Sequence, residues 1–272
     1  MELTAYQMWP PELSDPSGRR PGKPRKSGIT MIIDKGLGLS AFDDLTAVAG
    51  DYIDIIKIAF GTSPLYPAEL LMSKIRLAKS RGITVMPGGT LLEAAVIRDV
   101  VPAYFRQVLA LGFDGIEVSD GTIELPRKQR DELIRTAVEL GLKVFTEIGK
   151  KSFGSRIDAA VFAETAERDV EAGAELVTAE ARESGVGVGL FDERGVCREK
   201  DLHALLKAVR EPQKILWEAP QKEQQAALIK CIGPDVNLGN IAVQDVLALE
   251  SMRRGLRSDT FDLCVPYSDY VI

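Results

Sequence analysis

Eight short apolar runs recur along this chain, and each is followed by a segment with the periodicity of an amphipathic helix. The runs lie at residues 28–36, 53–63, 83–90, 115–122, 143–151, 175–185, 214–220 and 235–242. We predict helices at residues 40–49, 67–80, 90–111 (with a break near 101–102), 126–140, 157–172, 200–209, 221–232 and 243–256. Continuously apolar strands that alternate with helices are typical of a parallel sheet covered by helices.

Eight such units predict an α/β protein with a single (β/α)8 TIM barrel. The alternative is an open, doubly wound sheet, but no G-x-G-x-x-G fingerprint follows the first strand. The one dense glycine run, Gly185 to Gly189, has a different spacing. We therefore predict an N-terminal arm at residues 1–27, a barrel domain at 28–260 and a C-terminal tail at 261–272.

Charge and hydropathy limit the classes of partner. The chain of 272 residues has 34 basic and 40 acidic side chains and a formal net charge of −6. This acidic balance does not favour nucleic acid, and we expect the basic stretch at 19–26 to be a solvated arm rather than a nucleic-acid contact. We find no signal peptide and no apolar run of membrane-spanning length, so we expect a cytoplasmic protein with no membrane partner.

Histidine and cysteine are too scarce for several kinds of catalytic centre. His203 is the single histidine, and Cys197, Cys231 and Cys264 are widely spaced with no CxxC pattern. A zinc site, a disulfide framework and a Ser-His-Asp triad are therefore not expected. Acid–base chemistry would have to use Lys, Glu, Asp, Tyr or Cys.

Polar side chains gather where the predicted strands end. In such barrels the active site lies at the C-terminal ends of the strands. These ends hold Asp34, Lys35, Lys57, Gly88, Gly89, Thr90, Glu117, Ser119, Glu147, Lys150, Lys151, Glu180, Arg182, Glu218, Asn237 and Asn240. Carboxylates without His or Cys ligands favour Mg²⁺, and the accompanying cations favour an anionic substrate. A structural ion-pair network is the alternative interpretation of Glu180, Arg182 and Glu183.

Two turns in this set suit an anion. Gly88 and Gly89 lead into a helix, with Glu93 at capping-box spacing from Thr90, and a helix N-terminus attracts negative charge. Asn237 and Asn240 belong to the eighth run, where barrels often bind phosphate. Ordinary tight turns explain either motif about equally well.

Side-chain alternation separates two adjacent lysines. Successive side chains of a strand point to opposite faces, so Lys151 shares the orientation of Glu147 and Lys150 does not. This favours Lys151 as the lysine that faces the site.

The motifs together resemble those of one family, phosphosulfolactate synthase. The resemblance extends from Gly28 to Thr260 and is carried by the segments GITMIIDKGLG, YIDIIKIAFGTS, GFDGIEVSDGTI, TEIGKK, AEARESGVGVGLFDERG and LESMRRGLRSDT. It implies a (β/α)8 barrel that uses Mg²⁺ to add sulfite to phosphoenolpyruvate. The product would be (2R)-phospho-3-sulfolactate, at the start of a route to coenzyme M.

Roles for individual residues follow as expectations from that chemistry. We expect some of Asp34, Glu117, Glu147 and Glu180 to hold Mg²⁺. Lys151, or otherwise Lys150, would donate a proton to C2 of the substrate. The remaining residues would bind substrate: Arg182, Lys35, Lys57, Gly88, Gly89, Thr90, Ser119, Glu218, Asn237 and Asn240.

Two alternative functions and the oligomeric state stay open at this point. The chain could be a barrel enzyme that adds another nucleophile to phosphoenolpyruvate. It could instead be a non-catalytic homologue of the plant heat-stress-associated type. A homo-oligomer is expected if the apolar part of the arm, Tyr6 to Pro11, packs on a second copy, but the arm could equally fold back across its own barrel.

Overall fold

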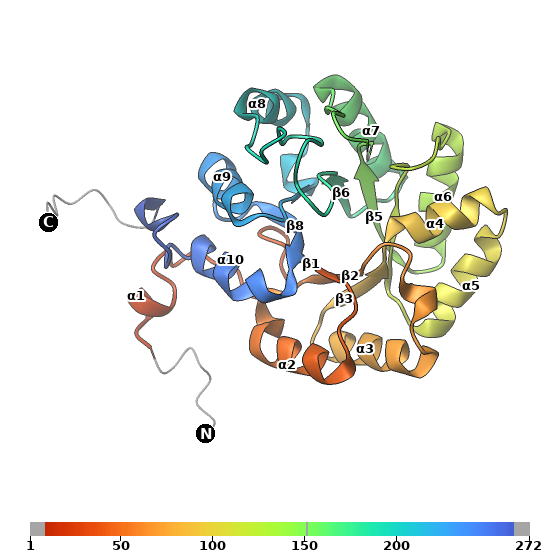
Figure 1. The fold of residues 1–272 in the computed structure, drawn as a ribbon, viewed down its shortest axis with the longest axis horizontal. Coiled ribbons are helices and arrows are strands. Elements are labelled where there is room, and N and C mark those ends of the chain that lie inside the picture. Colours follow the sequence, from red (N-terminus) through yellow and green to blue (C-terminus); the bar gives the residue numbers. More distant parts are fainter. Residues whose placement is uncertain (1–8, 151, 264–272) are drawn as a thin grey trace, which may run out of the picture.

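Eight parallel strands form the centre of the computed structural model, which describes residues 9–150 and 152–263. The strands are β1 (Thr30–Asp34), β2 (Ile55–Ile58), β3 (Thr84–Pro87), β4 (Gly115–Val118), β5 (Lys143–Ile148), β6 (Leu176–Ala179), β7 (Ile215–Glu218) and β8 (Asn237–Ala242). Their order in the sheet is β3-β2-β1-β8-β7-β6-β5-β4, and the Asp114 N–H donates to the Val85 carbonyl (3.4 Å) where β4 approaches β3. The predicted (β/α)8 barrel is therefore confirmed (Figure 1).

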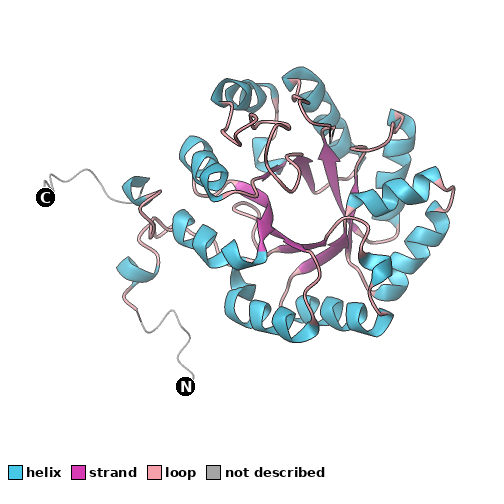
Figure 2. Ribbon diagram, in the orientation of Figure 1, coloured by secondary structure: helices cyan, strands magenta, loops and turns pink. Residues whose placement is uncertain are grey.

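Helices surround this ring of strands (Figure 2). They are α2 (Leu39–Ala49), α3 (Ala68–Ser80), α4 (Gly89–Ile97), α5 (Val101–Leu111), α6 (Arg127–Glu139), α7 (Ala159–Ala172), α8 (Glu199–Ala208), α9 (Lys222–Ile232) and α10 (Val246–Arg253). The predicted break in the segment 90–111 is confirmed, because Asp99 has a positive φ of 55° and Pro102 opens α5. Proline is well placed in a first turn, where its missing N–H costs no hydrogen bond.

Alternation along the strands creates two apolar layers. Inward-facing side chains form a small cluster inside the barrel, which consists of Ile29, Met31, Ile55, Met86, Phe145, Leu176 and Leu216. Outward-facing neighbours such as Ile32, Ile56 and Val144 pack against the helices in a much larger core. At most of the C-terminal strand ends the inward positions are polar instead, and these positions build the site described below.

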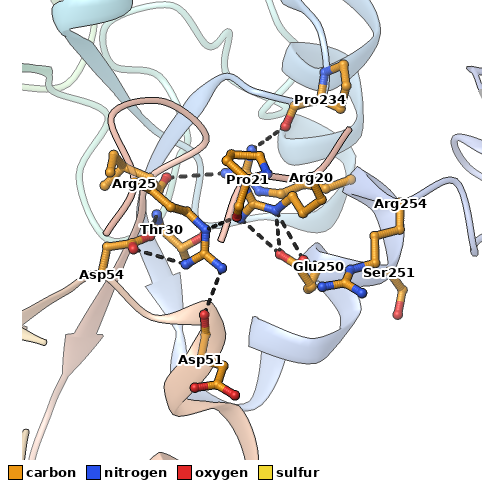
Figure 3. A network of polar contacts seen from close by, with 12 residues as sticks. Arg20, Pro21, Arg25, Thr30, Asp51, Asp54, Pro234, Glu250, Ser251 and Arg254 are labelled. Atoms are coloured by element: carbon orange, nitrogen blue, oxygen red, sulfur yellow. Dashed lines mark hydrogen bonds and ion pairs between the residues drawn. The ribbon is translucent and has the colours of Figure 1, made fainter. Parts of the chain in front are cut away.

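The N-terminal arm packs against the other end of the barrel. Arg20 pairs with Glu250 of α10 at 3.0 Å, and Arg25 pairs with Asp54, which precedes β2, at 3.0 Å (Figure 3). Lys23 donates to the Gly50 carbonyl (2.7 Å). The side chains of Arg20 and Arg25 are only 2% and 3% exposed, so the expectation of a solvated arm is wrong for both residues. Their burial is tolerated because each guanidinium has a carboxylate partner.

The short helix α1 (Pro11–Ser14) precedes this packed part of the arm and contains no buried residue. Trp9 and Leu13 are 65% and 57% exposed. The packing of this segment on a second copy stays a prediction, and Tyr6 lies outside the described residues. Among residues 9–150 and 152–263, no helix is both long and apolar enough to cross a membrane.

Candidate active site

A lysine surrounded by glutamates lies at the C-terminal mouth of the barrel. Lys57 of β2 places its Nζ 2.8 Å from Glu117 Oε1, 3.2 Å from Glu147 Oε2 and 3.2 Å from Glu218 Oε1. Burial by itself would lower the pKa of Lys57, but Glu117, Glu218 and Glu147 together raise that pKa well above its ordinary value. The ammonium is therefore charged throughout the neutral pH range.

Backbone N–H groups orient several of these carboxylates. Gly89 N donates to Glu117 Oε2 (2.8 Å), and Ala181 N donates to Glu218 Oε2 (3.0 Å). Glu180 at the end of β6 accepts from Arg182 N (2.5 Å). Hydrogen bonds of this kind fix a carboxylate in place and stabilise its ionised form.

Three of the carboxylates converge closely enough to hold a metal ion. Glu147, Glu180 and Glu218 each offer an oxygen, and these atoms lie within 4.8 Å of one another. All three residues are at most 3% exposed. Because the donors are oxygens from carboxylates, without imidazole or thiolate, the group suits a hard cation such as Mg²⁺ better than zinc. Among the described residues, the Lys57 ammonium contacts Glu117, Glu147 and Glu218, and Glu180 adds a fourth carboxylate to the same pocket. A divalent cation would balance this surplus of negative charge.

The turn between β3 and α4 approaches the site very closely. A Cβ at Gly88 would lie 2.6 Å from the Phe60 carbonyl oxygen, and a Cβ at Gly89 would lie 2.9 Å from Ser119 Cβ. Any larger residue would displace neighbouring atoms at either position. The predicted capping box is wrong, because Glu93 is buried and instead accepts from Ser119 Oγ (2.5 Å) and Thr122 N (3.1 Å). Glu93 thus ties the first turns of α4 to the loop that follows β4.

These elements enclose a pocket of about 170 Å³. Its polar lining consists of Lys57, Gly88, Gly89, Thr90, Glu117, Glu147, Glu180, Arg182, Glu183, Glu218 and Asn240, and Ile33 and Phe60 complete it. Ten of the sequence-predicted residues are therefore brought together. Arg182 is exposed, and its guanidinium makes no hydrogen bond or ion pair with a described residue. Asn240 Oδ1 is buried and accepts no hydrogen bond from the described part of the chain.

Three residues of this pocket have a backbone conformation that L-amino acids rarely adopt. Phe60, Arg182 and Asn240 have φ values of 53°, 60° and 58°. Such conformations cost about 1–3 kcal/mol each and tend to occur at functional sites. The sequence did not predict Phe60 as part of the site, because nothing in its flanking residues signals a left-handed turn. Glu93 was missed as a supporting residue, since its spacing from Thr90 suggested a helix cap.

The structure places other predicted residues outside this pocket. Asp34 points outward, where it pairs with Lys74 of α3 at 2.5 Å and accepts from Gly36 N and Leu37 N, both at 2.9 Å. Lys35 is exposed and pairs with Glu183. Ser119 lies beneath the pocket, where it supports Gly89.

Asn237 and the two adjacent lysines complete the account. Asn237 begins β8 at the opposite end of the barrel, where it bonds Ile29 N (3.0 Å) and the Gln213 carbonyl (2.8 Å). Lys150 donates to the carbonyls of Asp120 and Ile123, both at 2.9 Å. Lys151 lies outside the described residues, so its role stays a prediction.

A parallel barrel with a carboxylate-rich pocket at the C-terminal strand ends defines a protein of the (β/α)8-barrel enzyme class. A family model described as (2R)-phospho-3-sulfolactate synthase matches residues 18–259. The phosphosulfolactate synthase of Methanothermobacter thermautotrophicus is 43% identical over 243 residues, which cover 89% of this chain and 94% of that protein. The phosphosulfolactate synthase of Bacillus subtilis is 39% identical over 246 residues, which cover 90% of this chain and 96% of the relative. The chain therefore belongs to the (2R)-phospho-3-sulfolactate synthase family.

Solved structures support the fold alone. The YdjI aldolase of Escherichia coli K12 superimposes with a TM-score of 0.54 over 88% of this chain and 89% of its own. Its sequence is 14% identical to this one.

Proposed function

We propose that this protein is a lyase acting in the synthetic direction, which adds sulfite to C3 of phosphoenolpyruvate and forms (2R)-phospho-3-sulfolactate. The observation that carries the proposal is the buried group Glu147, Glu180 and Glu218 beside the exposed side chain of Arg182, in a chain of this family. The reaction joins two anions, so the site must offset repulsion between substrates as well as its own negative charge. Family membership supports this assignment, and so do the three converging carboxylates, because a divalent cation held by them would attract both anions.

Glu147, Glu180 and Glu218 would hold Mg²⁺, with Glu117 held apart by Lys57 and the Gly89 N–H. When bound, the ion would stabilise negative charge that develops on the substrate carboxylate. This set differs from the sequence-based expectation by including Glu218 and leaving out Asp34. In the absence of the ion, the ammonium of Lys57 would offset the electrostatic repulsion between Glu147 and Glu218, because it contacts both carboxylates.

The substrate anions would meet the exposed cation of the pocket. The Arg182 guanidinium has a fork of donors that matches phosphate or sulfite oxygens. In the addition, the sulfur lone pair of sulfite forms the C–S bond at C3, and the electrons of the C2–C3 double bond move toward C2 and the carboxylate. Protonation at C2 then completes the product. We assign that proton to Lys151, on the alternation argument given above.

The direct test is to incubate the full chain with phosphoenolpyruvate, sulfite and Mg²⁺ and to follow phosphorus NMR. We expect a new organophosphate signal that disappears when sulfite is left out or when a chelator removes the metal. Consumption of phosphoenolpyruvate without sulfite would instead identify a different nucleophile. A folded protein that yields no new organophosphate with all components present would contradict the proposal and favour a non-catalytic homologue.

A reaction that joins phosphoenolpyruvate and sulfite would begin a cytoplasmic route to a sulfonate. We propose that coenzyme M is the end product of this route. A strain that lacks the protein and loses sulfonate synthesis only when sulfite is the sulfur donor would support this placement.

A further inference from the structure

A second and larger cavity opens at the N-terminal mouth of the barrel, opposite the candidate active site. Its volume is about 510 Å³. The floor is apolar, since Ile29, Ile55, Phe145 and Leu176 of the inner cluster all line it. Apolar side chains of a barrel interior are usually covered at this end, so an open cavity over them needs an explanation.

The rim of this cavity is strongly basic although the chain is acidic. Five basic residues line it, namely Lys23, Arg25, Lys26, Lys143 and Lys214. Two acidic residues, Asp54 and Glu175, accompany them. The local excess of three positive charges contrasts with the formal charge of −6 for the whole chain. A cluster of one sign above a low-dielectric floor focuses its field on the space between.

Two of these cations are occupied by the protein itself. Arg25 binds Asp54 (3.0 Å) and the Pro21 carbonyl (2.9 Å) (Figure 3). These contacts fix the arm, whose residues 23–26 line one side of the cavity. Lys23 donates to the Gly50 carbonyl (2.7 Å). Burial lowers the pKa of Lys23, although Asp54 partly opposes this effect.

The other three cations have no acidic partner in the described part of the chain. Within residues 9–150 and 152–263, Lys26, Lys143 and Lys214 form no ion pair. They come from separate elements: the arm, the first residue of β5 and the turn before β7. Lys143 Nζ donates to Thr84 Oγ1 (2.9 Å), and Thr84 also lines the cavity, which places this ammonium at the rim. Three ammonium groups on different sides of one opening suit a single anionic head group.

We propose that this cavity binds a small organic anion, in which a carboxylate, sulfonate or phosphate group is attached to an apolar body. The lysines would receive the anionic group, and the apolar floor would bury the rest of the ligand. Inorganic phosphate could contact the lysines but has no apolar body to cover the floor, so it should bind far more weakly than such an organic anion. The basic stretch of the arm, which the barrel chemistry leaves unused, then has a role as part of a ligand site. The proposal is independent of the reaction at the opposite mouth.

The test uses anilinonaphthalene sulfonate as the probe, because it combines a sulfonate with an aromatic body and fluoresces in apolar surroundings. We expect saturable binding to the full chain. The double variant Lys143→Gln/Lys214→Gln should weaken that binding about tenfold, as expected from the loss of two charge-assisted contacts at partly exposed positions. The control is Lys128→Gln/Lys230→Gln, which removes the same charge from exposed positions of α6 and α9. Circular dichroism verifies that both variants are folded.

Competition identifies the site and the ligand class. Phenyl phosphate should displace the probe, inorganic phosphate should do so only at far higher concentration, and phosphoenolpyruvate with Mg²⁺ should leave the probe bound. Equal weakening in both double variants, or none in either, would overturn the proposal. Displacement by phosphoenolpyruvate at the concentration that fills the active site would also overturn it, because the probe would then occupy the opposite mouth.

Discussion

Lys57 Nζ and Glu218 Oε1 lie 3.2 Å apart, although β1 and β8 separate their strands in the sheet. This contact crosses the barrel mouth and is possible because both side chains point inward. Together with Glu117 and Glu147, it makes Lys57 the centre of the charge network. The lysine that we expected to clamp substrate thus contacts three carboxylates of the protein itself.

Lys57→Met should destabilise the protein strongly. Removing the ammonium leaves three glutamates facing one another in a buried site, and breaking a buried ion pair costs about 3–5 kcal/mol. Urea unfolding at neutral pH measures the loss. The deficit should shrink on acidification, because repulsion between the unpaired carboxylates falls as their negative charge is lost.

The wild type provides the comparison for that pH dependence. The pKa of Lys57 is raised in the folded state, so its contribution is present below the ordinary lysine pKa and is lost only as the pH rises through the higher folded value. Wild-type unfolding free energy should therefore show no loss from this group between neutral pH and about pH 9. A Lys57→Met protein with wild-type stability at neutral pH would contradict the network.

Glu180→Gln should weaken Mg²⁺ binding at least about tenfold, since it removes a charged oxygen ligand from the three-carboxylate group. Isothermal titration of the full chain with Mg²⁺ measures the affinity without relying on turnover. Glu183→Gln is the matched control, because its side chain is 50% exposed, pairs with Lys35 and lies outside that group. Equal losses in both variants would point to a general effect of charge rather than a metal ligand.

Asp34→Asn should lower stability and leave Mg²⁺ affinity unchanged. Asp34 and Lys74 are both fully buried and pair with each other, so the variant would leave a buried ammonium without its counter-charge, at a cost of about 3–5 kcal/mol. Chemical unfolding and Mg²⁺ titration of the same preparation separate the two effects. A stable variant that binds Mg²⁺ poorly would contradict this assignment and would support the original expectation that Asp34 is a metal ligand.

Alternation explains why much of the site could be predicted from the sequence. Glu117, Glu147, Glu180 and Glu218 are inward-facing residues at strand ends, and period-two alternation with the barrel rule places such residues together. Asp34 belongs to a strand end too, but it has the orientation of Ile32, which packs against the helices. The prediction from the sequence included polar residues at strand ends whether their side chains point inward or outward. Lys74 lies too far from Asp34 in the sequence to be recognised as its partner.

Strand length explains another difference. Asn237 and Asn240 are three positions apart, or roughly 10 Å along an extended chain, so they cannot both lie at one end of β8. The left-handed backbones of Phe60 and Arg182 depend on the tertiary packing around the pocket, and no local propensity predicts them.

Gly89→Ala should reduce turnover about a hundredfold, because displacement of site residues by about 1 Å can have that effect. The added Cβ would meet Ser119 and would lie 3.1 Å from Glu117 Oε2, so the carboxylate beside Lys57 would have to move. Steady-state kinetics at saturating substrate measures the change. Gly38→Ala is the control, since Gly38 has an ordinary φ of −69° and open space around its Cβ position. Equal activity of the two variants would show that the close approach at Gly89 is unimportant for turnover.

The two adjacent lysines should differ sharply in their effect on turnover. Lys150 holds the carbonyls of Asp120 and Ile123 and pairs with Glu124 at 3.2 Å, so it anchors the loop after β4 rather than facing the pocket. Lys150→Ala should therefore cost little activity, whereas Lys151→Ala should lower kcat by about 10²–10⁴, as expected for the loss of a general acid. The assay is the phosphorus NMR reaction, with Mg²⁺ affinity measured in parallel to verify that each site is intact. A severe loss in Lys150→Ala with full activity in Lys151→Ala would assign the proton to Lys150 and contradict the alternation argument.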